Sequence, residues 1–132
     1  ELALSFVAIQ NGDADTASNH YSILKPQRNM MFSGEGAINV DRILALLART
    51  MGNLSDAQSH FEDALTFCRN ADYRPELAWS LHDYADMLLE RGEPGDQAKA
   101  TSLLDEDLQI STDLGMRPLT ERVLSKRDIL KA

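Results

Sequence analysis

The chain has 132 residues, of which 43% are apolar and 26% are charged, a composition that suits one globular domain with its own core. Its 21 acidic and 13 basic residues give a net charge of −8, which repels a phosphate backbone and argues against nucleic-acid binding by this chain. The single cysteine excludes an internal disulfide, and no apolar run approaches the roughly 20 residues that a membrane span needs.

Three segments of the chain repeat one pattern. In each, a helical apolar stripe ends at a glycine, and a second stripe follows a polar turn. The second stripes begin with Ala17, Ala57 and Ala100, and each carries a large residue four positions later. These alanines recur after 40 and 43 residues, a period typical of arrays of helix pairs rather than of sheets. We therefore predict an all-α fold of stacked antiparallel helix pairs with about seven helices.

The first helix pair is predicted over residues 1–26, with its turn at Gly12 and a cap at Asp13. Its first helix is strongly apolar and resembles an open edge through which two copies of the chain can associate. The apolar side chains of that helix are Leu2, Leu4, Phe6, Val7 and Ile9.

The segment 25–36 interrupts the pattern, because Pro26, Gly34 and Gly36 are too many breakers for a helix interior. It also carries the apolar run 30–32, Met-Met-Phe. One interpretation is a long loop that packs this run onto a neighbouring pair. The other is a lid or docking segment that exposes it.

The remaining pairs are predicted over 35–71 and 74–114, and a terminal helix over 117–131. Ser55 is placed to cap the helix that carries Ala57 and Ala64, two small residues on one face with Phe61 between them. Such small residues allow a neighbouring backbone to approach closely, so the pairs are expected to stack.

This pattern resembles the tetratricopeptide repeat, in a lengthened form. The resemblance is strongest in GNLSDAQSHFEDAL, RPELAWSLHDYADMLLERGEPGDQAKATSLLDEDL and DLGMRPLTERVL. It implies a right-handed superhelix whose inner face binds a protein or peptide, with no enzymatic activity and no cofactor. The same runs resemble the C-terminal repeat region of bacterial signalling proteins that carry a cyclase or a LuxR-type output domain. Because the chain begins at Glu1 with neither Met nor a signal-like head, we expect a piece of a larger, cytoplasmic protein.

The first helix of each predicted pair is expected to line the inner face. Arginines that converge beside a tryptophan on an acidic chain would form a local basic groove, which suits an acidic peptide. The alternative is that these arginines pair with neighbouring acids such as Glu121 and only solvate the surface. The residues predicted for this groove are Arg42, Leu46, Arg49, Trp79, His82, Asp86 and Arg122.

The sequence contains only weak signals of metal binding or catalysis. His82 and Asp86 share a helix face, and His60 lies near Glu62 and Asp63, but neither group forms a recognised motif, so no metal site is predicted. Cys68 falls inside an apolar stripe, where an inert buried thiol is expected.

Asp107 occupies a position of the repeat where a small residue is usual, and if its carboxylate is buried it needs a hydrogen-bond donor.

The repeat pattern and the predicted groove together predict a partner-binding module. Two alternatives are a small-molecule sensor closed by segment 25–36 and a self-assembly module.

Overall fold

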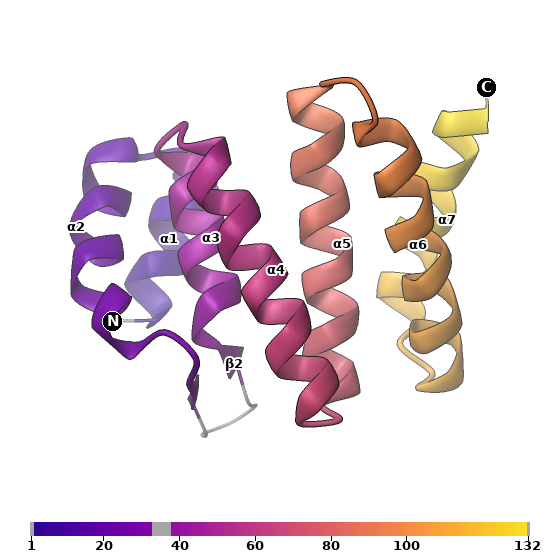
Figure 1. Cartoon of the computed structure of the whole chain (residues 1–132), viewed down its shortest axis with the longest axis horizontal. Helices are drawn as coiled ribbons and strands as arrows, with labels where there is room; N and C mark the ends of the chain where they lie inside the picture. Colours follow the sequence, from indigo (N-terminus) through magenta and orange to yellow (C-terminus); the bar gives the residue numbers. More distant parts are fainter. Residues whose placement is uncertain (1, 33–37, 132) are drawn as a thin grey trace. The chain divides into compact units, whose positions relative to one another are not determined.

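A computed structural model describes residues 2–32 and 38–131, without the side chains of residues 2, 32 and 131. Within these ranges it contains seven α-helices, which confirms the predicted all-α fold (Figure 1). The helices are α1 (Leu2–Asn11), α2 (Ala14–Leu24), α3 (Val40–Thr50), α4 (Leu54–Asn70), α5 (Arg74–Arg91), α6 (Asp96–Asp113) and α7 (Arg117–Lys131). No helix in the described part of the chain is long and apolar enough to cross a membrane.

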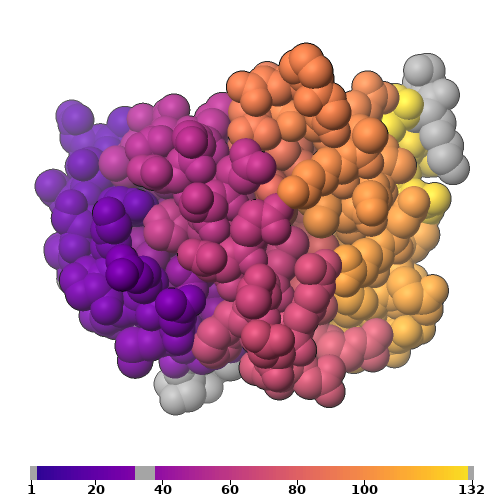
Figure 2. Space-filling view, in the orientation of Figure 1, coloured from indigo at the N-terminus to yellow at the C-terminus, as the bar shows by residue number. Residues whose placement is uncertain are grey.

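The chain divides into two compact units, residues 1–67 and 68–132. The first unit contains α1 to α3 and most of α4, and the second contains the end of α4 and α5 to α7. In the second unit α6 packs against α5 and α7 and runs antiparallel to both (Figure 1). On the face shown in Figure 2, α6 (orange) supplies most of this unit's surface and α7 (yellow) lies at the edge. The expectation of a single domain over 1–132 stays a prediction.

The repeated pattern is the buried face of α2, α4 and α6. The three alanines that begin the stripes are 0% exposed, and the large residues four positions later are 9% exposed or less. The positions three residues further on are buried too, although one of them is an aspartate. In order along the chain, the nine residues are Ala17, Tyr21, Leu24, Ala57, Phe61, Ala64, Ala100, Leu104 and Asp107.

The helices end and begin largely at the predicted residues. Gly92 closes α5 at φ 66°, a left-handed conformation that glycine adopts without a Cβ clash, and its N–H donates to the Leu88 carbonyl. Asp13 caps α2, since its carboxylate accepts from the Thr16 N–H at 3.1 Å. The predicted cap at Ser55 is wrong: α4 begins at Leu54, and the Asn53 side chain accepts from the Asp56 N–H instead.

The segment 25–36 is more structured than the sequence predicted. It contains a short 3-10 helix (Lys25–Gln27), and strands β1 (Met31–Phe32) and β2 (Ile38–Asn39) form an antiparallel ladder. Met30 is 50% exposed, so it is only partly packed. The Phe32 side chain and residues 33–37 lie outside the described residues, so the choice between packed loop and lid stays open.

Candidate functional site

The seven residues predicted for the groove are divided between the two units. Arg42, Leu46 and Arg49 lie on α3 in the first unit. Leu46 is only 8% exposed, so little of it is accessible to a partner, while both arginines are half-buried. The other four residues lie in the second unit, three on α5 and one on α7.

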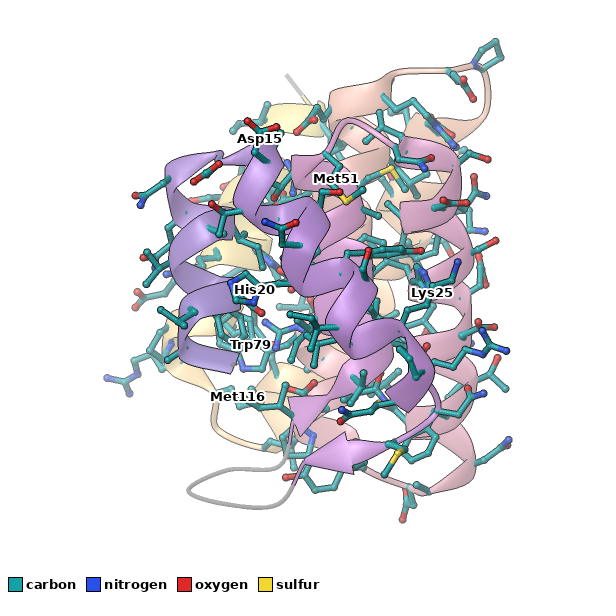
Figure 3. The ribbon with its side chains drawn as sticks, turned by 90° about the vertical axis from the view of Figure 1, so that its left-hand side faces the viewer. Asp15, His20, Lys25, Met51, Trp79 and Met116 are labelled. Atoms are coloured by element: carbon teal, nitrogen blue, oxygen red, sulfur yellow. The ribbon has the colours of Figure 1, made fainter. Side chains whose placement is uncertain are left out.

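The four residues of the second unit form one cluster. Trp79 of α5, which is labelled in Figure 3, packs edge to face against His82, with ring centroids 6.0 Å apart. Arg122 of α7 places its guanidinium carbon 5.7 Å from the centroid of the Trp79 ring, within cation–π range. One turn further along α5, an Asp86 carboxylate oxygen lies 3.9 Å from His82 Nε2. The structure therefore brings the predicted Trp, His, Asp and Arg together.

A pocket of about 570 Å³ opens beside this cluster between α5 and α7, and we call it the α5–α7 pocket. Sequence reasoning found three of its residues and missed most of those from α7. Their spacing of three to four residues along α7 was the available signal, because it places them on one helix face. The lining residues are His82, Asp86, Pro118, Glu121, Arg122, Ser125, Lys126 and Ile129.

Most charges around the α5–α7 pocket are paired, but those of Arg122 and Glu121 make no ion pair with any described residue. The Lys126 ammonium forms an ion pair with Asp86, and the next residue, Arg127, pairs with Asp105 of α6 at 3.0 Å. Arg122 is exposed and makes no ion pair with any described residue. The predicted alternative, in which Arg122 pairs with Glu121, is therefore not what the described residues show. The Arg122 guanidinium is left facing solvent with an aromatic ring behind it.

His82 is held between two carboxylates and is 5% exposed. Its Nδ1 lies 3.0 Å from an Asp83 oxygen, and its Nε2 has no hydrogen-bond partner among the described residues. The imidazole therefore supports the edge of the Trp79 ring and the wall of the pocket. The arrangement offers an aromatic face, an apolar contact at Ile129 and one unpaired cation, which together suit recognition of a ligand.

A sequence profile described as tetratricopeptide repeat matches residues 36–111, which is more than half of the chain. The chain belongs to the tetratricopeptide repeat family. No curated protein sequence and no solved structure matched the chain. Tetratricopeptide repeats generally mediate protein–protein interactions and are typically non-catalytic. The matched residues contain two helix pairs, α3 with α4 and α5 with most of α6, so α5 is the first helix of a tetratricopeptide repeat.

Asp107 lies on the buried face of that repeat and not in the α5–α7 pocket. It is 0% exposed, and neither carboxylate oxygen has a hydrogen-bond partner among the described residues. Burial, together with the negative charges of Asp83 and Glu106, raises the pKa of Asp107 to about 8. Asp107 is therefore a buried, unpaired acid at the position of α6 that corresponds to Ala64 of α4.

Proposed function

We propose that this chain is a non-enzymatic interaction module that binds a peptide carboxylate in the α5–α7 pocket. The observation that carries the proposal is Arg122, an exposed guanidinium stacked on Trp79 without an ion pair among the described residues. A planar guanidinium binds a carboxylate through two parallel hydrogen bonds, and stacking on an indole restricts its orientation beforehand. Tryptophan and arginine are also the residues most enriched at the energetic centres of protein interfaces.

The basic groups of the pocket lining leave Arg122 as the contact for an acidic ligand, whereas the exposed Glu121 carboxylate in the same lining opposes one. Lys126 is bound to Asp86, and Asp86 also lies near His82, so these groups are neutralised within the protein. An incoming carboxylate therefore meets Arg122 as the one cation of the pocket lining that no described acid pairs with. On a chain of net charge −8, the long-range field opposes an acidic ligand, so the affinity depends on this local contact.

We also propose that the module belongs to a bacterial signalling or transcription-regulatory protein of the cytoplasm. The runs that resemble such proteins support this context, and so does Cys68, a free and buried thiol that suits a reducing compartment. The alternative sensor role depends on segment 25–36, whose residues 33–37 lie outside the described part of the chain, so it stays a prediction.

A peptide selection tests the binding proposal. Random peptides displayed on phage are selected on the chain, and the selected peptides are synthesised and measured by fluorescence anisotropy. We expect Asp, Glu or a free C-terminus at one fixed position, and about a tenfold loss of affinity for Arg122→Ala, which removes a charge-assisted hydrogen-bond pair.

Arg117→Ala is the matched control, because Arg117 lies at the start of the same helix but outside the α5–α7 pocket. It should bind the selected peptides with wild-type affinity. Peptides without an acidic position, or an Arg122→Ala variant that binds as well as the wild type, would refute the proposal.

Self-association is a second candidate function, favoured by three exposed apolar side chains in the first unit. Leu4 and Val7 on α1 are 58% and 50% exposed, and Ile23 on α2 is 50% exposed. If two copies bury this surface, light scattering will report a mass that rises with protein concentration. Leu4→Glu should then keep the chain monomeric, because a buried carboxylate without a partner opposes association. A mass that stays monomeric for the wild type at all concentrations would exclude this role.

A further inference from the structure

A buried carboxylate and a buried imidazole face each other in the first unit without a hydrogen bond between them. Asp41 of α3 is 0% exposed and His60 of α4 is 8% exposed. Asp41 Oδ1 and His60 Nδ1 lie 3.7 Å apart, and neither atom has a hydrogen-bond partner among the described residues. Buried polar atoms are nearly always satisfied, so two such atoms directed at the same point indicate a missing group between them.

Asp63 completes this group. It lies one helical turn after His60 on α4, and positions three residues apart share a helix face. One oxygen of each carboxylate and the imidazole nitrogen all lie within 4.8 Å of one another. Unlike the other two side chains, Asp63 is exposed, so the group is open to solvent on one side.

The second carboxylate oxygen of Asp41 and the second ring nitrogen of His60 are held by contacts with other residues. Asp41 Oδ2 accepts a hydrogen bond from the Asn29 N–H at 2.8 Å, which directs Oδ1 toward His60. His60 Nε2 lies 2.8 Å from the Tyr21 hydroxyl, and the two rings pack edge to face. Supporting contacts of this kind orient the ligands of metal sites.

Tyr21 suits the role of acceptor for the imidazole. Its hydroxyl oxygen is the atom that lies 2.8 Å from His60 Nε2. Lys25, labelled in Figure 3, places its ammonium 5.6 Å from the centroid of the Tyr21 ring. A neutral hydroxyl can accept from an Nε2–H, which is the tautomer that leaves the lone pair of Nδ1 pointing at Asp41.

We propose that Asp41, His60 and Asp63 bind one divalent transition-metal ion of the Zn²⁺ class. One imidazole and two carboxylates are a donor set that such ions accept. Two ligand atoms about 2.1 Å from a tetrahedral ion are about 3.4 Å apart, close to the separation between Asp41 and His60. The exposed Asp63 side chain closes the remaining distance by a rotamer change, and the fourth position is left to water. The ion would join α3 to α4 and so stabilise the first unit.

Zinc titration of the whole chain tests this site. After removal of metal with a chelator, ZnCl₂ is titrated by calorimetry at about pH 7.5, where an ordinary imidazole is unprotonated. We expect one ion per chain and a higher melting temperature with zinc, because the ion binds the folded state selectively.

Three variants locate the ion. Asp63→Ala, at an exposed position that the fold tolerates, and His60→Ala should each lower the zinc affinity at least about tenfold, as loss of a ligand requires. Tyr21→Phe should lower it by about 10- to 100-fold, the effect of removing a supporting contact. Asp15→Ala is the matched control, because Asp15 is an exposed carboxylate of the first unit that lies outside this group.

Three results would overturn the proposal. Absence of stoichiometric zinc binding would show that Asp41 and His60 form only a loose ion pair. Binding that survives Asp63→Ala, or that is lost with Asp15→Ala, would place the ion elsewhere. If His60→Ala does not fold, Asp63→Ala decides between these outcomes.

Discussion

Asp107→Ala is expected to raise the free energy of unfolding at pH 7 by about 2 kcal/mol, although it deletes a buried side chain. With its pKa raised to about 8, Asp107 must take up a proton on folding at neutral pH. That uptake costs on the order of 4 kcal/mol at pH 7, relative to an ordinary aspartate. Alanine removes this cost and leaves a small cavity, whose penalty offsets part of the gain.

The pH dependence of this gain in stability follows from the raised pKa of Asp107. Between the ordinary aspartate pKa and about 8, the folded chain holds a proton that the unfolded chain has released. Wild-type unfolding free energy should therefore fall as pH rises through this window, and the variant should lack this component. The gain from Asp107→Ala should disappear below about pH 3, where the carboxyl is protonated in both states.

Urea denaturation of wild type, Asp107→Ala and Asp107→Asn at several pH values measures both effects. Asp107→Asn keeps the size of the side chain and removes its charge, so it separates electrostatics from packing. A loss of stability in both variants at pH 7 would mean that Asp107 has a partner that stabilises its charged form, contrary to the contacts described here.

Phe61→Ala is expected to cost about 3–5 kcal/mol of unfolding free energy, the largest effect of any substitution proposed here. Phe61 is 0% exposed and lies between Ala57 and Ala64, which are also 0% exposed. Its ring supplies most of the volume on this face of α4, and the flanking alanines are too small to fill the space that it leaves.

Urea denaturation followed by far-ultraviolet circular dichroism measures this loss. Ile129→Ala is the control, since it truncates an apolar side chain that is 73% exposed and should change stability by no more than about 0.5 kcal/mol. Equal effects of the two substitutions would contradict the assignment of the repeated stripe as the core of the helix pairs.

The sequence predicted the fold well because its signals are local and repeated. The alanine recurrence at Ala17, Ala57 and Ala100 identified the buried faces, and the turn glycines marked the helix ends. The ladder of Met31–Phe32 with Ile38–Asn39 was missed, since two-residue strands have no periodicity to detect. The Ser55 cap was wrong because Asn53, two residues earlier, is an equally good cap residue.

The sites were predicted only in part, because they depend on which helices lie side by side. Trp79, His82 and Asp86 share one helix, so their proximity followed from spacing, and Arg122 was placed from the terminal helix. The ion pair of Lys126 with Asp86 was missed, since the two residues lie on different helices and no local pattern relates them. Asp41 and His60 are 19 positions apart in the sequence, and no local pattern indicates that they meet.

The proposed binding role is tested most directly through the single tryptophan of the chain, whose indole N–H gives one isolated NMR signal. We expect a selected acidic peptide to shift the Trp79 signal in a saturable way. The affinity should fall as salt is raised, because salt screens the contact with Arg122. A peptide that binds tightly while the Trp79 signal stays unchanged would place the binding surface elsewhere and contradict the account.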